Sequence, residues 1–333
     1  MVRKHSRILL QAIGFMLVAL GAPMAFAEDR SVVLVATQKA GDRGPIDGLI
    51  DGLEQAEAAF GVETRFIEAL DPATFENTLH ALARRGTDII VTTFFAMGAA
   101  VQNLAAEYPE TRFVVVVAAP LDPPLANARI VGYATQENAY LAGTFGATVS
   151  ETGHLGLIAG VPLPYVWADV NAMTMAARAV KPEATVTHAF VQSFEDPVKG
   201  REVAAGLYDR GIDVIYTGAA ASDIGVVEAA DETDNLVIVA SPPLVEQAPE
   251  SVGFVASFEW ARTMMIEIEN ALGDFESGFR VGGIATGEII MTFSDAYAAT
   301  NPRAPEARAA TETVYDQIAA GQMTVPYDET EPK

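Results

Sequence analysis

Residues 85–93 read RGTDIIVTT, and residues 210–218 read RGIDVIYTG. Each copy follows an amphipathic run, TFENTLHALA at 74–83 and GREVAAGLY at 200–208. A glycine, an aspartate and a short apolar run in this order are typical of a helix that ends at a glycine and is followed by a buried strand. After both copies come another helix-like stretch and another apolar run, at 113–118 and 236–241. The sequence therefore predicts that one βαβ pattern is built twice.

Apolar runs and amphipathic runs alternate along most of the chain. We expect helices in most of the gaps between strands, the first beginning at Pro45, because proline suits the first position of a helix. Such alternation favours α/β architecture, with parallel sheets covered by helices on both faces. A chain of 333 residues has room for two domains of this kind. The predicted strands lie at 31–37, 62–68, 88–93, 113–118, 129–134, 154–159, 185–191, 213–218, 236–241 and 253–257.

No long linker or low-complexity tract separates the two halves. We therefore expect two lobes, each a parallel sheet flanked by helices, joined by several short crossings that act as a hinge. Lobe 1 is predicted to hold residues 28–134 and 256–287, and lobe 2 residues 135–255 and 288–333. Open parallel sheets bind ligands outside the carboxyl ends of their strands, so two facing lobes predict a cleft that closes around a small molecule.

The first 27 residues have the pattern of a cleavable secretory signal peptide. Basic residues at the start are followed by an apolar stretch from Ile8 to Leu20 and by the small-x-small pattern Ala25-Phe26-Ala27. A membrane anchor is the alternative, and the shortness of the apolar stretch disfavours it. The sequence contains no cysteine, which excludes disulfides and a lipid anchor on an N-terminal cysteine. We therefore expect a periplasmic protein that is not a lipoprotein.

Charge and motifs exclude several classes of function. A formal net charge of −23 repels phosphate backbones, so a nucleic acid polymer is not an expected partner. The sequence has no dinucleotide fingerprint after its first strand, no P-loop, no nucleophile elbow and no HExxH motif. Its four histidines are scattered, without the spacing of metal ligands. We therefore expect no enzyme, no cofactor and no metal site.

Three stretches resemble the Bmp, or basic membrane protein, family of ABC transporter substrate-binding proteins, which includes purine nucleoside receptors. They are QSFEDPVKGREVAAGLYDRGIDVIYTGAAASDIGVVEAADE at 192–232, YATQENAYLAG at 133–143 and GHLGLIAGVPLPYVWADVNAM at 153–173. The resemblance implies a type I periplasmic-binding fold without catalysis. It also implies delivery of a nucleoside-like or purine-like ligand to a membrane permease. We expect the protein to be a monomer. A periplasmic sensor or receptor-associated protein with no transport role is the alternative, because both uses need the same two lobes.

The resemblance is incomplete at positions that contact nucleosides in the family. Pro45 and Ile46 stand where a stacking phenylalanine and an asparagine are usual. Ala240 replaces an aspartate that binds the ribose in family members, and Trp260 replaces a lysine. Without the aspartate, affinity for a nucleoside should fall, so a free base or another flat heteroaromatic ligand is equally consistent with the sequence.

Three aromatic residues are the leading candidates for ligand contact. Phe94 and Phe95 follow the strand at 88–93 directly, where a stacked base would gain about 1–3 kcal/mol per aromatic contact. Phe194 follows the strand at 185–191, and the resemblance implies that it stacks on the opposite face of the ligand. For each residue the competing interpretation is packing in the core.

Five further candidates each have a structural alternative. Asp42 lies in a glycine-flanked loop, where aspartate also favours turns for backbone reasons. Ser222 and Asp223 begin a predicted helix and are equally typical of a helix cap. Trp260 either closes the binding pocket or packs against other side chains. Trp167 and Tyr165 follow the loop GVPLP. For Asp196 and Glu137 the structural roles, a helix cap and a hinge contact, are favoured over ligand contact.

Overall fold

The computed structural model describes residues 30–41 and 43–332. The expected signal peptide, residues 1–27, and the candidate ligand residue Asp42 lie outside the described residues. Among the residues that are described, no helix combines the length and the apolar character needed to cross a membrane.

The first body of the molecule is a parallel sheet with the order β11-β5-β4-β3-β1-β2. Along β1, Val32 and Leu34 face one layer of helices, while Val33 and Val35 face the other. This alternation buries both faces of the strand. The strands are β1 (Ser31–Ala36), β2 (Glu63–Glu68), β3 (Ile89–Thr93), β4 (Arg112–Val116), β5 (Ala128–Tyr133) and β11 (Gly278–Gly282).

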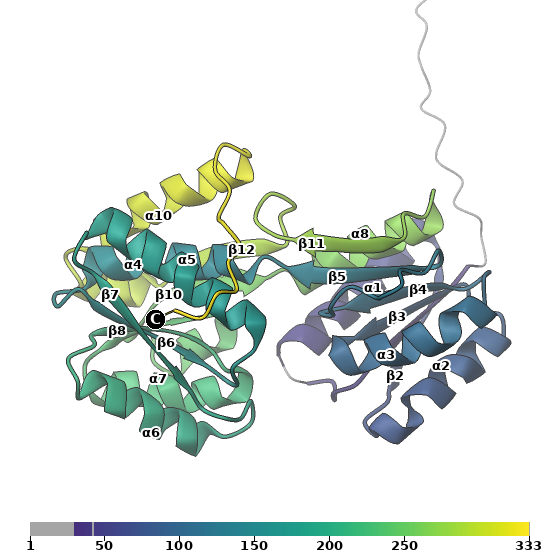
Figure 1. The fold of residues 1–333 in the computed structure, drawn as a ribbon, viewed down its shortest axis with the longest axis horizontal. Helices are drawn as coiled ribbons and strands as arrows, with labels where there is room; N and C mark the ends of the chain where they lie inside the picture. The colour runs from purple at the N-terminus through teal and green to yellow at the C-terminus, as the bar shows by residue number, and fades with distance from the viewer. Residues whose placement is uncertain (1–29, 42, 333) are drawn as a thin grey trace, which may run out of the picture.

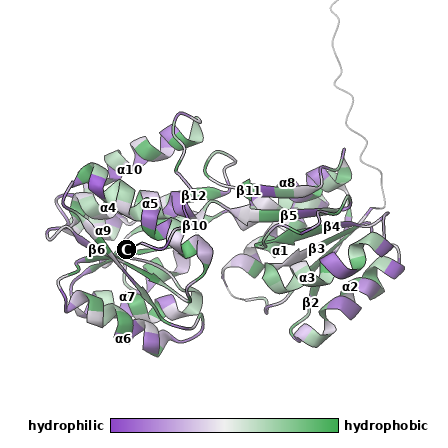
Figure 2. Ribbon diagram, viewed as in Figure 1, coloured by the Kyte–Doolittle hydropathy of each residue, from purple (hydrophilic) through white to green (hydrophobic). Residues whose placement is uncertain are grey.

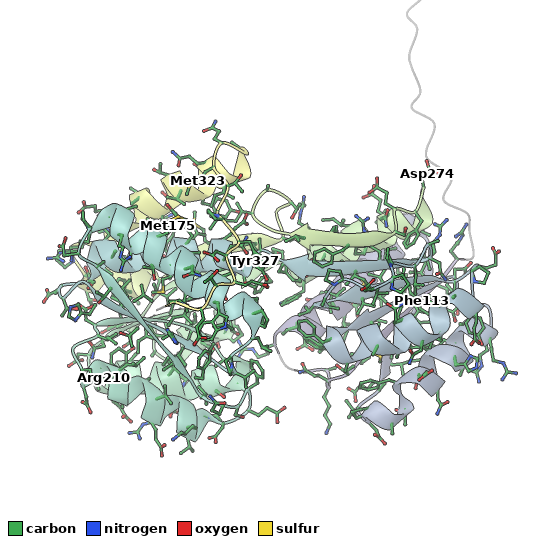
Figure 3. The ribbon with its side chains drawn as sticks, viewed as in Figure 1. Phe113, Met175, Arg210, Asp274, Met323 and Tyr327 are labelled. Carbon is green, nitrogen blue, oxygen red and sulfur yellow. The ribbon has the colours of Figure 1, made fainter. Side chains whose placement is uncertain are left out.

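Two pairs of helices cover this sheet. Helices α1 (Pro45–Phe60) and α8 (Trp260–Leu272) pack on one face, and α2 (Phe75–Arg84) and α3 (Phe94–Leu104) pack on the other. Figure 1 shows this body on the right, and Figure 3 shows Phe113 of β4 inside it. The expected helix start at Pro45 is confirmed.

The second body repeats the plan with the order β12-β10-β9-β8-β6-β7. Helices α4 (Thr135–Val149), α5 (Pro164–Val180) and α10 (Ala304–Ala319) lie on one face, and α6 (Pro197–Tyr208) and α7 (Asp223–Glu232) on the other. In Figure 2 the strands of both bodies are mostly green, while purple gathers on the outer helices. The remaining elements are β6 (His154–Ala159), β7 (Thr185–Phe190), β8 (Val214–Gly218), β9 (Leu236–Val239), β10 (Val252–Phe258), β12 (Ile289–Phe293) and α9 (Asp295–Thr300).

The predicted α/β fold with two lobes is confirmed, and each of the ten predicted strands occurs within two residues of its expected ends. Strands β11 and β12 were not among the predicted strands; they are edge strands formed by the glycine-rich segment 276–293. Strand β12 runs antiparallel to β10, so the second sheet is not wholly parallel. The boundaries of the two lobes stay a prediction.

The repeated phrase has the same structural role in both lobes. Gly86 and Gly211 adopt the left-handed conformation, with φ of 81° and 85°, which ends the preceding helix. The aspartate that follows each glycine binds the chain at the start of a neighbouring strand. Asp88 accepts hydrogen bonds from the backbone N–H and hydroxyl of Ser31, and Asp213 accepts from the Ser150 hydroxyl and the N–H of residues 151 and 152. The repeat therefore encodes the entry into β3 and β8, an inner strand of each sheet.

Within residues 43–332 the chain passes between the two bodies three times (Figure 1). The crossings are residue 134 between β5 and α4, residue 259 between β10 and α8, and residues 283–288 between β11 and β12. All three leave the first or second sheet at the carboxyl end of a strand.

Close packing of α7 on α6 gives a test of the fold. A Cβ atom at Gly225 would lie 1.7 Å from the carbonyl oxygen of Pro197, whereas a Cβ at Gly206 meets nothing within 4 Å. We expect Gly225→Ala to lower the free energy of unfolding by about 1–3 kcal/mol, because the helices have to separate. The matched variant Gly206→Ala should raise it by up to about 1 kcal/mol. Urea denaturation measures both, and equal stabilities would contradict the described packing.

Candidate functional site

The strand order of each sheet locates its natural ligand-binding edge. In the first sheet the chain continues from β1 to its neighbour β2 on one side, and from β3 to its neighbour β4 on the other side. In the second sheet it continues in the same way from β6 to β7 and from β8 to β9. At such a switch point the loops at the carboxyl ends diverge and leave a crevice, where open α/β sheets bind ligands. The loops of interest therefore follow β1, β3, β6 and β8.

One contact shows that these edges face each other. Arg43 lies in the loop after β1, and Glu246 ends the short 3-10 helix Pro242–Glu246 that follows β9. The Arg43 Nη2 atom lies 3.0 Å from both carboxylate oxygens of Glu246. Since the three crossings also leave at carboxyl ends, the two sheet edges are connected both by the crossings and by this ion pair. We call the region between the edges the inter-lobe space.

Phe94 and Phe95 lie at the switch point of the first sheet. Strand β3 ends at Thr93 and α3 begins at Phe94 without an intervening loop. The Thr93 hydroxyl accepts a hydrogen bond from the Thr37 backbone N–H, which ties together the loops after β1 and β3. The Phe94 side chain is half-buried, and Phe95 is 55% exposed. The Phe95 ring is therefore free to contact a ligand.

Phe194 lies over the switch point of the second sheet. Its ring packs on Gly160, the residue that follows β6, so closely that a Cβ atom at Gly160 would lie 2.3 Å from the ring. The Gln192 backbone N–H donates to the Gly160 carbonyl at 2.7 Å and holds the two loops together. Phe194 remains 36% exposed. Each sheet edge thus carries a partly exposed phenylalanine at its switch point.

Backbone strain gathers at the same edges. Of the six described residues other than glycine that have positive φ, five lie in the segments that follow the carboxyl ends of strands. Such conformations cost about 1–3 kcal/mol each and cluster at functional sites. The five residues are Arg43, Phe94, Val117, Gln192 and Ala220.

The two candidate tryptophans lie in aromatic clusters. Trp260, at the start of α8, packs against Tyr133 and Phe258, with ring centroids 5.2 and 5.1 Å away. This cluster lies where two crossings leave the sheets, so Trp260 borders the hinge. Trp167 packs edge-on against His188 and Phe190 of the edge strand β7, at 5.2 and 5.4 Å. Both rings have protein partners here, as the packing interpretation expects.

Ser222 and Asp223 are buried and have protein partners. The Ser222 hydroxyl accepts from the Asp196 N–H at 3.0 Å and donates to the Ser193 carbonyl at 3.2 Å. The Asp223 carboxylate accepts from the Thr217 hydroxyl and from the Ala219 N–H. Burial raises the pKa of Asp223 to about 7, although these donors oppose the shift. Ser222 precedes α7 but makes no side-chain hydrogen bond that caps it, so the cap interpretation is wrong here. The two residues instead join the loops of the second lobe.

The residues for which a structural role was favoured have that role here. The Asp196 carboxylate accepts from the Lys199 N–H at 2.9 Å and caps α6. The Glu137 carboxylate accepts from the Ile284 N–H at 2.7 Å, which ties α4 to the third crossing. Burial raises the pKa of Glu137 above its ordinary value. Tyr165 is half-buried in the first turn of α5 and packs against the core of the second lobe.

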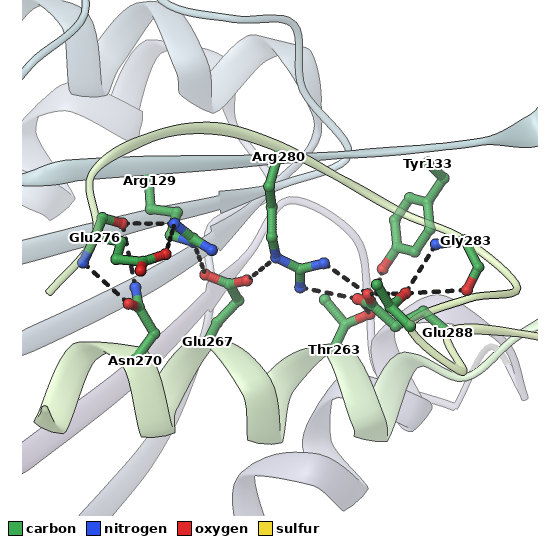
Figure 4. Close-up of polar contacts among 10 residues, drawn as sticks. Arg129, Tyr133, Thr263, Glu267, Asn270, Glu276, Arg280, Gly283 and Glu288 are labelled. Atoms are coloured by element: carbon green, nitrogen blue, oxygen red, sulfur yellow. Dashed lines mark hydrogen bonds and ion pairs between the residues drawn. The ribbon is translucent and has the colours of Figure 1, made fainter. Parts of the chain in front are cut away.

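A buried ladder of charges, which the sequence analysis missed, supports the third crossing (Figure 4). Arg280 of β11 pairs with Glu267 of α8 and donates to Glu288 at 2.6 and 2.9 Å. Glu288 also accepts from the Thr263 hydroxyl at 2.6 Å. At the other end of the ladder, Arg129 lies 3.1 Å from Glu267. Alternation along β11, with Arg280 between two exposed apolar residues, is the only sequence signal for this arrangement.

Burial affects the two acids of the ladder differently. Desolvation raises the pKa of Glu267 despite its two arginine neighbours. For Glu288, desolvation is outweighed by donors from Arg280, Thr263 and residue 286, which lower its pKa. Glu288 is therefore the firmly ionised end of the ladder, next to the hinge. Among the residues that the structure describes, no cluster of histidine, aspartate and glutamate is suited to a metal ion.

Asp169, a buried acid beside the first crossing, gives a pH-dependent test. Desolvation raises its pKa to about 8, and a 2.7 Å hydrogen bond from the Thr135 hydroxyl opposes the shift. Between pH 4 and 8 the unfolded carboxyl ionises while the folded one keeps its proton, so this group makes the protein less stable as pH rises. We expect Asp169→Asn to remove this slope in denaturation measured from pH 4 to 8. Thr135→Val should extend this slope to pH values above 8, because loss of the hydrogen bond raises the pKa of the folded state further. Identical slopes in wild type and Asp169→Asn would contradict the assignment.

Comparisons with known proteins agree with this geometry. The chain is 33% identical over 183 residues to a Haloferax volcanii protein whose name provisionally assigns it as an ABC transporter glucose-binding protein; the match covers 50% of this chain and 43% of that protein. It is 31% identical over 157 residues to a purine-binding protein of Brucella abortus, covering 46% and 43%. The chain thus spans less than half the length of these two relatives.

The fold is shared with solved solute-binding proteins. A structure of an ABC transporter solute-binding protein from Aeropyrum pernix K1 matches with a TM-score of 0.72 and 18% identity, covering 90% of this chain and 94% of that one. The family model Bmp, described as ABC transporter substrate-binding protein PnrA-like, matches residues 30–302. The resemblance seen in the sequence is confirmed, and the chain belongs to the Bmp family of PnrA-like ABC transporter substrate-binding proteins.

Proposed function

We propose that this protein is an extracytoplasmic binding protein of an ABC importer and captures a flat heteroaromatic, purine-like ligand in the inter-lobe space. The observation that supports it most directly is the pair of aromatic positions at the two switch points. Phe95 and Phe194 come from different lobes, and the two residues are 55% and 36% exposed. A planar ligand stacked between two such rings would gain about 1–3 kcal/mol from each face.

The proposed ligand favours the closed arrangement because both lobes contact it only when they are closed. A ligand shifts the open and closed populations only by binding one of them more tightly. Moving the ratio from 1:99 to 99:1 needs about 5.5 kcal/mol. Two stacked faces with a few desolvated hydrogen bonds give energy of that order. The closed lobes would then present one composite surface to a permease, and export by the expected signal peptide would place the protein in the periplasm.

Two side-chain groups that would bind a nucleoside are absent from the loops, and their absence narrows the class of ligand. Ala240, directly after β9, offers no carboxylate to ribose hydroxyls. Ile46, the second residue of α1, is buried in the core and offers no side-chain amide. A free purine base therefore fits the proposal better than a nucleoside. The name of the Brucella relative supports purines, and that of the Haloferax relative makes glucose the natural competing ligand.

Removal of one stacking ring tests the site. We expect Phe194→Ala to weaken binding of adenine or guanine by tenfold or more, because one face of the base loses its aromatic partner. Phe279→Ala is the matched control, since Phe279 is 45% exposed but lies on the edge strand β11. Calorimetric titration measures affinity, and circular dichroism checks the fold. Unchanged affinity in a folded Phe194→Ala protein would remove this residue from the site.

Direct comparison of ligands tests the proposed class. We expect adenine or guanine to bind more tightly than adenosine or guanosine, because no carboxylate at position 240 binds ribose, and we expect glucose to bind more weakly than either. Isothermal titration calorimetry with each compound gives the order. Tighter binding of a nucleoside would reject the free-base assignment, and tighter binding of glucose would reject the heteroaromatic class.

A further inference from the structure

The ion pair between Arg43 and Glu246 connects the lobes at a point remote from the crossings. The two residues are 203 positions apart, and one Arg43 nitrogen lies 3.0 Å from each carboxylate oxygen of Glu246. Among the ion pairs between described residues, this is the one that joins the loops of the first sheet edge to those of the second. It exists only while the lobes are close together.

Each partner is positioned by its own lobe. The Arg43 and Gly41 N–H groups donate to the Asp47 carboxylate at 2.8 and 2.6 Å, which fixes the loop before α1. On the other side, Leu244 is buried in the core of the second lobe, and the Gln247 side chain donates to the Ile224 carbonyl. Opening the lobes would therefore separate Arg43 from Glu246 without disturbing either loop.

Both side chains are well exposed, with 62% of Arg43 and 72% of Glu246 accessible. Exposed pairs contribute little to the stability of a fold and are screened by salt. An ion pair of this strength can form and break reversibly. It shifts the ratio of closed to open molecules by at most about fivefold, so that full closure still requires the ligand.

We propose that Arg43 and Glu246 form a latch that favours the closed arrangement of the lobes before ligand binds. The latch raises the fraction of molecules that are ready to bind, and so raises apparent affinity by the same factor. Its strength falls as ionic strength rises. The proposal rests on the proposed inter-lobe binding function for its purpose, but its test requires no ligand.

The absence of cysteine from the sequence permits a clean measurement of lobe distance. Glu76 on α2 and Val198 on α6 are exposed positions on different lobes and accept cysteine-linked spin labels. Pulsed electron resonance on the doubly labelled, ligand-free protein then gives the distribution of distances between the lobes. We expect Arg43→Glu and Glu246→Arg each to raise the open-to-closed ratio threefold or more at low salt, with the increase shrinking at high salt.

The exchanged pair Arg43→Glu with Glu246→Arg should return the ratio to that of wild type. Arg201→Glu is the matched control, because Arg201 and Glu232 form a similarly exposed pair inside the second lobe. It should leave the distribution unchanged. Wild-type distances in both single variants, or an exchanged pair that stays as open as the single variants, would overturn the latch. Because this experiment contains no ligand, its outcome is independent of the experiment that tests the ligand class.

Discussion

Burial of both faces of each sheet is the constraint on which the rest of this structure depends. A parallel strand covered by helices on both sides has no free surface except at its ends, where the backbone leaves the hydrogen-bonded ladder. In both sheets the connections diverge at the first strand, which opens a crevice at the carboxyl edge. The three crossings leave from the same edges and turn them toward each other. The location of the candidate site thus follows from topology, before any side chain is considered.

The third crossing is anchored in both lobes, by different kinds of contact. On the first lobe, Glu288 is fixed by the buried guanidinium of Arg280 and by the Thr263 hydroxyl. On the second lobe, the Ile284 side chain is buried in the core, and its N–H donates to Glu137. Breaking a buried ion pair costs about 3–5 kcal/mol, and full burial of an isoleucine side chain contributes about 1.5–3 kcal/mol. Rotation of the lobes should therefore be absorbed between these anchors, at residues 285–287, which are less buried.

Sequence patterns predicted the inner strands because those strands are continuous apolar runs that begin after a glycine and an aspartate. The edge strands β11 and β12 were missed because they are partly exposed and lie in a glycine-rich segment; burial alternates along Gly278–Gly282, and β12 is only partly buried. Phe94 and Phe194 could be placed at sheet edges from chain order alone. The partners of Ser222 and Trp167 could not be predicted, since they lie on other loops and strands. The contact of Arg43 with Glu246 depends on how the lobes meet, which no local pattern encodes.

Strained backbone explains how the phenylalanines come to lie at the edges. Phe94 has φ of 65°, a conformation that bulky residues rarely adopt, and it connects β3 to α3 with no loop between them. Because no loop residues separate the two elements, Phe94 and Phe95 lie directly at the end of the strand. In the second lobe Gln192, with φ of 66°, turns the chain after β7 so that Phe194 reaches Gly160. Each lobe therefore accepts about 1–3 kcal/mol of local strain to hold an aromatic ring beside the inter-lobe space. Such strain is consistent with selection for binding rather than for stability.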